Sequence, residues 1–332
     1  MALTGVVANA LPAMTAPELP AFSGQTRLLV IAPHPDDETI ATGLLIQQVV
    51  AAGGEVRILL LTAGDNNPWP QRWLERRLWI RDADRQRWGQ RRQAEMRQAM
   101  QQLDLPESAL ECMGWPDMGL NACLLQPESL AVSLLATTIG RFRPSLIALP
   151  SIDDRHPDHG AAHVLVRLAL ASQAAAPQLL TYLVHGHARH AGFVEIEGSR
   201  EQMMNKLAAL DAHESQMALS GQRMRRLAMR AESYLTVPAV SSAVLPWQPP
   251  RWLRPWLRLS LVSARGAQSW NWHEAPLQHV PGGGYRLSPT GGMAGQSQFA
   301  RLASTLPSPW IFDHWGWCEL PCDLSRHGAG LA

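Results

Sequence analysis

A strand, a helix and a second strand follow one another in residues 28–61, and this order limits the folds open to the chain. Residues 28–32 (LLVIA) form a continuous apolar run, which is typical of a strand buried on both faces. Residues 38–52 have apolar positions at helical spacing, a glycine pair stops the helix, and residues 56–61 are apolar again. Such a unit predicts a parallel sheet whose strands are joined by right-handed crossovers.

The rest of the chain extends this pattern and then changes character. Beyond about residue 237 prolines cluster and helical periodicity is weak. We therefore predict an α/β fold, with a Rossmann-like, mostly parallel sheet flanked by helices and an irregular or β-rich C-terminal extension. The expected further helices cover approximately residues 86–103, 127–141, 161–175 and 202–217, and the expected further strands cover 145–149 and 179–184. The predicted organisation is an irregular leader over residues 1–25, a main domain over 26–237 and an extension of unknown role over 238–332.

Composition excludes several classes of protein. The 332 residues carry a net charge of only +1, so no overall field favours nucleic acid or an acidic membrane surface. No apolar run reaches the roughly 18 residues of a membrane-spanning helix. The four cysteines contain no C-x-x-C pair, which favours a reducing, cytoplasmic compartment. A bridge or a metal site at Cys318 and Cys322 is the less favoured alternative.

Two clusters of histidine and acidic residues each follow a predicted strand. Residues 34–38 read His-Pro-Asp-Asp-Glu and come directly after the first strand. Residues 156–159 read His-Pro-Asp-His and follow the strand at 145–149 after a short loop. Ligands of open α/β sheets bind outside the carboxyl ends of the strands, so both clusters are predicted to lie at the same edge of the sheet.

Together the clusters offer what a catalytic zinc site needs, which is three nitrogen or oxygen ligands and an open position for water. Adjacent Asp36 and Asp37 point in different directions, so one can bind the metal while the other takes a proton from water. A further imidazole can stabilise an oxyanion or protonate a leaving nitrogen. The alternative is that each cluster is a turn whose aspartate caps a helix. Two clusters at matching strand ends favour metal-assisted hydrolysis of an amide.

The clusters resemble the signature motifs of the LmbE/PIG-L family of zinc-dependent N-acetylglucosaminyl deacetylases. The family's first motif, Ala-His-Pro-Asp-Asp-Glu, is similar to residues 33–38, where Pro33 replaces the commoner alanine. Its second motif, His-Pro-Asp-His, is intact at residues 156–159. The resemblance covers roughly residues 26–235 and does not extend to the C-terminal part.

This resemblance implies a cofactor and roles for the residues of the motifs. It implies one Zn²⁺ per chain, with other divalent metals as alternatives. The implied ligands are His34, Asp37 and His159. Asp36 would be the general base, and His156 would assist the oxyanion and the leaving group.

Three further segments are similar to the family. Arg92 and Glu95 fit its Arg-x-x-Glu sequence, and residues 115–117 resemble its Pro-Asp loop. Residues 206–216 resemble its Lys-x-x-Ala-Leu…Ser-Gln segment. His213 stands there in place of the usual tyrosine, which leaves the role of that position open.

Residues 65–90 form a long insertion at the predicted catalytic edge. Loops at such edges often carry substrate recognition. We expect at least one of Asn67, Trp69 and Arg72 to contact substrate. The alternative is a solvated, salt-bridged helix whose tryptophans pack inward.

Other candidates carry two interpretations each. Arg155 either reaches the site or pairs with Asp153 or Asp154 at the surface. Asp117 either binds a sugar hydroxyl or caps its loop, and the resemblance favours binding. His163 lies one helical turn after His159 and is expected to be a packed helix residue rather than a fourth ligand. Whether His185 lines the pocket stays open.

The resemblance implies an enzyme that hydrolyses linear amide bonds. It would remove the N-acetyl or another N-acyl group of an amino sugar or amino-sugar conjugate, releasing acetate and a free amine. The alternatives are a zinc amidohydrolase acting on a non-sugar, thiol or glycopeptide conjugate, and a non-catalytic sugar- or nucleotide-binding module. The module is disfavoured because Asp36 and His156 are intact and no G-x-G-x-x-G follows the first strand. The expected partner is a small-molecule or glycoconjugate substrate, and the sequence is compatible with a homo-oligomer.

Overall fold

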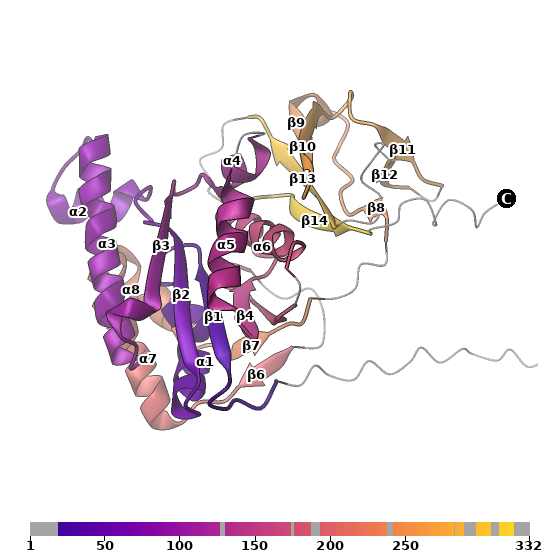
Figure 1. The fold of residues 1–332 in the computed structure, drawn as a ribbon. Helices are drawn as coiled ribbons and strands as arrows, with labels where there is room; N and C mark the ends of the chain where they lie inside the picture. Colours follow the sequence, from indigo (N-terminus) through magenta and orange to yellow (C-terminus); the bar gives the residue numbers. More distant parts are fainter. Residues whose placement is uncertain are drawn as a thin grey trace, which may run out of the picture.

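The structure, a computed structural model, has a main α/β body and a smaller β-rich C-terminal region (Figure 1). Most of the predicted leader and Cys322 lie outside the described residues. Within the described part of the chain, no helix is both long and apolar enough to cross a lipid bilayer. The residues that the structure describes are 19–126, 130–173, 176–186, 193–237, 242–281, 283–288, 297–306 and 312–321.

A five-stranded parallel sheet forms the centre of the main body. Its strands lie in the order β3-β2-β1-β4-β5, and all neighbouring strands are parallel. The strand order reverses between β1 and β4, which is the place where open α/β sheets bind their ligands. The strands are β1 (Arg27–Ala32), β2 (Glu55–Thr62), β3 (Leu110–Trp115), β4 (Leu146–Pro150) and β5 (Gln178–Tyr182).

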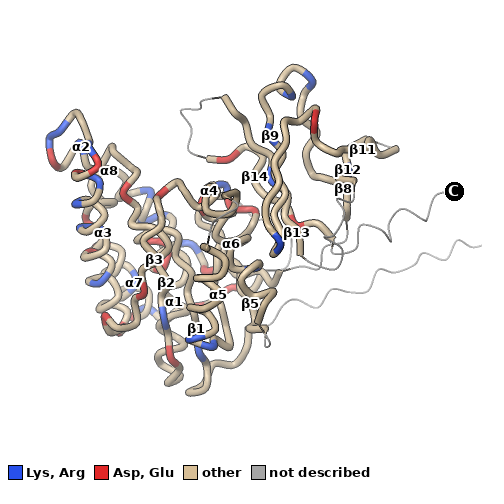
Figure 2. The backbone as a smooth tube through the Cα atoms, turned by 45° about the horizontal axis from the view of Figure 1, so that its top comes forward, with Lys and Arg blue, Asp and Glu red and all other residues tan. Residues whose placement is uncertain are grey.

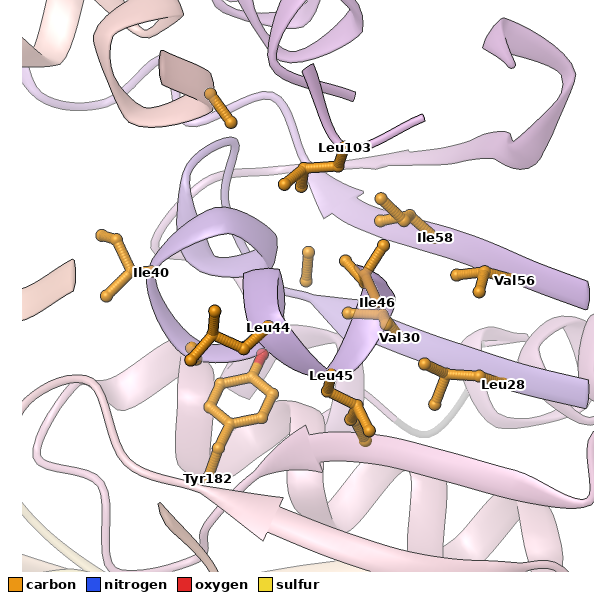
Figure 3. Close-up of a cluster of buried hydrophobic side chains, with 14 of the residues drawn as sticks. Leu28, Val30, Ile40, Leu44, Leu45, Ile46, Val56, Ile58, Leu103 and Tyr182 are labelled. Atoms are coloured by element: carbon orange, nitrogen blue, oxygen red, sulfur yellow. The ribbon is translucent and has the colours of Figure 1, made fainter. Parts of the chain in front are cut away.

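Helices cover both faces of this sheet because its central strands are apolar on both sides. Figure 3 shows Leu44 and Ile46 of α1 in one buried cluster with Val30 and Ile58 of the sheet. That face carries α1 (Asp37–Ala51), α3 (Asp82–Gln102), α7 (Arg200–Ala212) and α8 (Glu214–Ala228). The opposite face carries α4 (Leu120–Leu125), α5 (Ala131–Phe142) and α6 (Pro157–Leu170). The short α2 (Pro68–Glu75), the 3-10 turn Glu107–Ala109 and the antiparallel pair β6 (Val194–Ile196) and β7 (Glu232–Tyr234) complete the body.

The C-terminal region consists of two small antiparallel sheets with a core of their own. The four-stranded sheet has the order β10-β9-β13-β14 and the three-stranded sheet the order β11-β12-β8. Val262, Phe299 and Trp317 of the first sheet extend into the apolar core around α4, α5 and α6. The elements are β8 (Val244–Leu245), the 3-10 turn Arg254–Trp256, β9 (Leu257–Ser263), β10 (Gly266–Asn271), β11 (Leu277–His279), β12 (Tyr285–Leu287), β13 (Gln298–Ser304) and β14 (Gly316–Leu320).

The structure confirms the parallel α/β sheet and the β-rich C-terminal region. One expectation about a single element was wrong, and some elements were not predicted. The strand β3 and the short helix α4 were not predicted, and the single helix expected over residues 202–217 is two helices that meet at His213. The expected insertion over residues 65–90 contains α2 and the start of α3.

Candidate active site

The two histidine clusters meet at the carboxyl ends of β1 and β4, on either side of the reversal in strand order. His34 follows β1, and His156 is the N-cap of α6, which begins soon after β4. The ring centroids of His34 and His156 lie 4.6 Å apart, and those of His34 and His159 lie 5.4 Å apart. The two clusters therefore lie together at one edge of the sheet, as predicted.

Three atoms of these clusters converge closely. Oδ2 of Asp37 lies 3.3 Å from Nδ1 of His34 and 3.2 Å from Nε2 of His159. All three residues are buried. Zinc–nitrogen and zinc–oxygen bonds are about 2.0–2.1 Å long, so two ligand atoms of a tetrahedral site lie about 3.3 Å apart. The separations of the Asp37 oxygen from the two histidine nitrogens are therefore those expected of neighbouring ligands of a zinc-sized ion.

The buried His159 supports the same interpretation. Neither of its ring nitrogens makes a hydrogen bond, although each lies 3.2 Å from a carboxylate oxygen. Buried polar atoms without a partner are rare in folded proteins and often mark a place where an ion or water binds. Burial lowers the pKa of His159, but the carboxylates of Asp37 and Asp154 outweigh this effect and raise it to about 10. The same negative potential would attract a divalent cation.

Each of the two histidines also faces a carboxylate with its second nitrogen. Nε2 of His34 lies 3.3 Å from Asp117 and 3.4 Å from Asp158, and Nδ1 of His159 lies 3.2 Å from Asp154. Metal-binding histidines commonly have such outer partners, which fix the ring and raise its basicity. Among the described residues, His34, Asp117 and Asp158 also form a second group of closely spaced donors, as do His34, His156 and His159.

Asp154 is the residue of the site that the sequence analysis missed. It had been considered only as a surface partner of Arg155, yet its side chain is buried. Its carboxylate accepts the backbone N–H groups of His156, Val184 and His185 at 2.9–3.0 Å. Its position two residues before a histidine motif was the available signal, because motif histidines often need an acidic partner nearby.

Asp158 ties the second cluster to the loop after β3. Its Oδ2 accepts the N–H of Met118 at 2.7 Å, and its Oδ1 accepts the N–H of Leu120 at 3.2 Å. The side chain is fully buried. Asp158 thereby holds the Asp117 loop against His34.

Asp36 lies in a strained backbone conformation beside the proposed ligands. Its φ of 128° falls in a region that residues other than glycine rarely adopt, and such strain persists mainly at functional sites. Burial raises the pKa of the Asp36 carboxyl to about 6, while the neighbouring Arg92 works in the opposite direction. Arg92 donates to Oδ2 of Asp36 at 3.2 Å and to the carbonyl of Pro35 at 2.6 Å. A carboxyl held in this way is suited to exchange a proton near neutral pH.

His156 is arranged as a hydrogen-bond donor. Its Nδ1 accepts the N–H of Asp158 at 3.3 Å, so the neutral ring carries its proton on Nε2. Burial and the neighbouring histidines, above all His34, lower its pKa well below 6.5. The ring of His185 lies 5.6 Å from that of His156 and 5.2 Å from that of His159, so His185 does line the site.

The segments with weaker resemblance form a buried support around Asp36. Nε2 of His213 lies 3.0 Å from Glu38, whose other oxygen accepts the N–H of Asp36 at 2.9 Å. Glu95 accepts the N–H and the hydroxyl of Ser215. His213, where the family usually has tyrosine, thus reaches Asp36 through Glu38.

The residues of the insertion that were predicted to contact substrate lie in and beside α2, and the loop that leads into α2 reaches the site. Asn67 and Trp69 are exposed, and the guanidinium of Arg72 lies 5.1 Å from the Trp69 ring. Asn66, next to Asn67, donates its N–H to Asp117 at 2.7 Å, which brings the start of this loop to the site. Figure 2 shows basic residues gathered around α2 and along α3. Contact of these residues with substrate stays a prediction.

Comparison with known proteins shows what the main body is similar to. The GlcNAc-PI de-N-acetylase family (PIG-L) matches residues 29–170. A 1D-myo-inositol 2-acetamido-2-deoxy-alpha-D-glucopyranoside deacetylase of Mycolicibacterium smegmatis is 32% identical over 171 residues. That match covers 48% of this chain and only 57% of the relative. The corresponding protein of Tsukamurella paurometabola is 28% identical over 66% of this chain and 84% of its own length.

A solved structure shows the same fold. The N,N'-diacetylchitobiose deacetylase from Pyrococcus horikoshii superposes with a TM-score of 0.51. It is 18% identical, and the match covers 64% of this chain and 84% of that protein.

Proposed function

We propose that this chain is a zinc-dependent N-deacetylase of an amino sugar or amino-sugar conjugate, related to the PIG-L family whose model matches residues 29–170. The observation that carries the proposal is the converging donor set of His34, Asp37 and His159 beside the strained Asp36. The names of the relatives support acetamido sugars as the substrate class.

In this proposal His34, Asp37 and His159 hold the ion. Zn²⁺ bound there would lower the pKa of a water to about 7 and polarise the acyl carbonyl. The carboxylate of Asp36 takes the proton of the attacking water as its oxygen bonds to the acyl carbon. Arg92, His213 and Glu38 hold that carboxylate in place.

His156 and Asp36 complete the reaction. The Nε2–H of His156 donates a hydrogen bond to the oxygen of the tetrahedral centre, where negative charge develops. When the carbon–nitrogen bond breaks, the proton held by Asp36 is available to the leaving nitrogen. The products are a free amine and acetic acid, which ionises to acetate by giving its proton to the amine or to water, so atoms and charge balance.

The proposal is tested by acetate release from a panel of N-acetylated sugars, sugar conjugates and non-sugar amides. We expect turnover of the sugars, loss of turnover in chelator and recovery on addition of Zn²⁺. The variant Asp36→Asn should lose about 10²–10⁴-fold in kcat while keeping its metal content. Turnover that persists in chelator, or wild-type turnover by Asp36→Asn, would contradict the proposal. Turnover of non-sugar amides alone would show that the substrate is not an amino sugar.

A further inference from the structure

The C-terminal region contributes an aromatic side chain to the mouth of the site. The Phe312 ring lies 5.3 Å from the ring of His185 and 6.4 Å from that of His156, measured between centroids. Next to Phe312, the N–H of Asp313 donates to the carbonyl of Arg155 at 2.8 Å. The N–H of Arg155 in turn donates to the carbonyl of His185 at 2.9 Å. These bonds fix the segment that carries Phe312 directly against the second histidine cluster.

Two arginines from different elements gather on the same ring. The guanidinium carbon of Arg155 lies 5.8 Å from the Phe312 centroid, and that of Arg223 on α8 lies 6.0 Å from it. Both arginines are exposed. Arg223 also lines a hollow of about 500 Å³ along α8. The Arg223 end of the Arg155–Phe312–Arg223 cluster therefore borders open space.

The charges of these two arginines are not balanced by nearby carboxylates. Within the described ranges, neither guanidinium forms an ion pair with a carboxylate oxygen within 4 Å, and both lie beside the Phe312 ring. Asp313 is bound by both oxygens to Arg301, at 2.7 and 2.9 Å. Asp154 is buried and engaged by three backbone N–H groups. Two like charges beside one ring repel each other, and an anion between them would relieve that repulsion.

We infer that the Arg155–Phe312–Arg223 cluster is a subsite for an anionic substituent of the substrate, a phosphate or a carboxylate, carried next to the amide that is cleaved. Arginine binds both oxyanions through paired N–H groups. Phe312 supplies an apolar wall between the subsite and the two histidines. The inference rests on the proposed function for the placement of the amide, but anion binding by the cluster does not depend on catalysis.

The direct test is calorimetric binding of pyrophosphate to the intact, metal-loaded protein. Arg223→Gln should weaken binding about tenfold, and added salt should weaken it in the wild type because the arginines are exposed. Arg225→Gln is the matched control. Arg225 lies on the same helix, and its charge is already paired with Asp211 at 2.7 Å. Equal binding by wild type and Arg223→Gln, or equal weakening by both variants, would overturn the subsite.

A kinetic test separates the subsite from the reaction. The ratio of kcat/KM for N-acetylglucosamine 1-phosphate over N-acetylglucosamine should fall about tenfold in Arg223→Gln and stay constant in Arg225→Gln. An unchanged ratio in Arg223→Gln would count against an anionic substrate. If neither sugar is deacetylated while pyrophosphate binding still depends on Arg223, the proposed function fails and the subsite stands.

Discussion

Asp117 touches a proposed metal ligand and also the loop that leads into α2, so two roles are open to its carboxylate. Its Oδ1 lies 3.3 Å from Nε2 of His34, and its Oδ2 accepts the N–H of Asn66 at 2.7 Å. Burial alone would raise its pKa, but contact with His34 outweighs this and lowers the pKa to about 2. The carboxylate is therefore ionised at neutral pH.

The variant Asp117→Asn distinguishes the two roles. If Asp117 orients His34, the variant should bind Zn²⁺ about 10–100-fold more weakly, because outer partners of ligand histidines have effects of that size. If Asp117 binds only substrate, KM should rise while zinc affinity stays constant. Competition with a chromophoric chelator measures the affinity, and Asp65→Asn, which alters a neighbouring and less buried carboxylate, is the control.

The burial of His163 should make the folding stability of the protein sensitive to acid. Its Nδ1 lies 2.9 Å from the carbonyl of Pro150, as expected for a packed helix residue, and burial lowers its pKa to about 4. Arg167 adds to that lowering. In the unfolded chain His163 takes up its proton near pH 6.5. Its contribution to the free energy of unfolding should therefore be fully present above that pH and be lost as the pH falls to about 4.

The loss from His163 should reach up to about 3 kcal/mol at pH 4. The variant His163→Gln does not titrate, so its free energy of unfolding should fall less than that of the wild type between pH 7 and 4.5. Urea unfolding at each pH measures this, and His273→Gln, which alters an exposed histidine, is the control. Parallel pH curves for wild type and His163→Gln would show that His163 does not carry the effect.

At the scale of elements, the short helix α2 exposes large aromatic side chains that are not packed into the core. Trp69 is 67% exposed, and Trp79 beyond the end of the helix is 84% exposed. The first expectation, that this segment contacts substrate, fits exposed tryptophans better than the alternative in which they pack inward. Such exposed aromatic side chains are available to stack on a sugar.

Trp69→Ala should therefore raise KM by about two- to tenfold, the range of a single aromatic contact. Its free energy of unfolding should change by less than about 0.5 kcal/mol, as is usual for an exposed position. Trp79→Ala is the matched control and should leave KM unchanged. Equal KM values for both variants and the wild type would mean that α2 does not reach the substrate.

Sequence periodicity predicted the elements that have one clear apolar pattern and missed those that do not. The central strand β1 is buried on both faces, so its apolar run is unbroken. The edge strand β3 is only partly buried, and its sequence (LECMGW) mixes apolar and polar residues. No proline or glycine marks the break between α7 and α8 at His213. The side chain of His213 contacts Glu38 there, and a contact between distant residues leaves no local signal in the sequence.

For the whole molecule, local motifs predicted the residues that converge at the carboxyl ends of β1 and β4, but not the side chain that the C-terminal region places beside them. The ligand and base candidates lie within two short motifs, and their spacing follows from the strand ends. Phe312 reaches His156 only through packing between segments more than a hundred residues apart, which no local pattern encodes. The same packing buries Trp317, whose Nε1–H donates to Asn121 at 3.0 Å.

This packing predicts that stability and activity are coupled across the two regions. Trp317 is 5% exposed and lies in the core around α4, α5 and α6, and Arg167 pairs with Glu319 beside it at 2.6 Å. Trp317→Ala should cost about 3–5 kcal/mol of unfolding free energy, as for other buried tryptophans. Because the docked region carries Phe312, pyrophosphate binding should weaken as well.

Urea unfolding and calorimetry on the same protein preparations test this coupling. Trp252→Ala, which removes a tryptophan that is 74% exposed in the same region, should leave both quantities close to wild type. If Trp317→Ala lost stability but bound pyrophosphate as the wild type does, Phe312 would not depend on this interface. If it lost neither, the apolar contact of Trp317 with the main body would not hold the regions together. The C-terminal strands would then be positioned by the apolar contacts of Val262 and Phe299 and by the Asp313–Arg155 backbone bond and the Arg167–Glu319 pair.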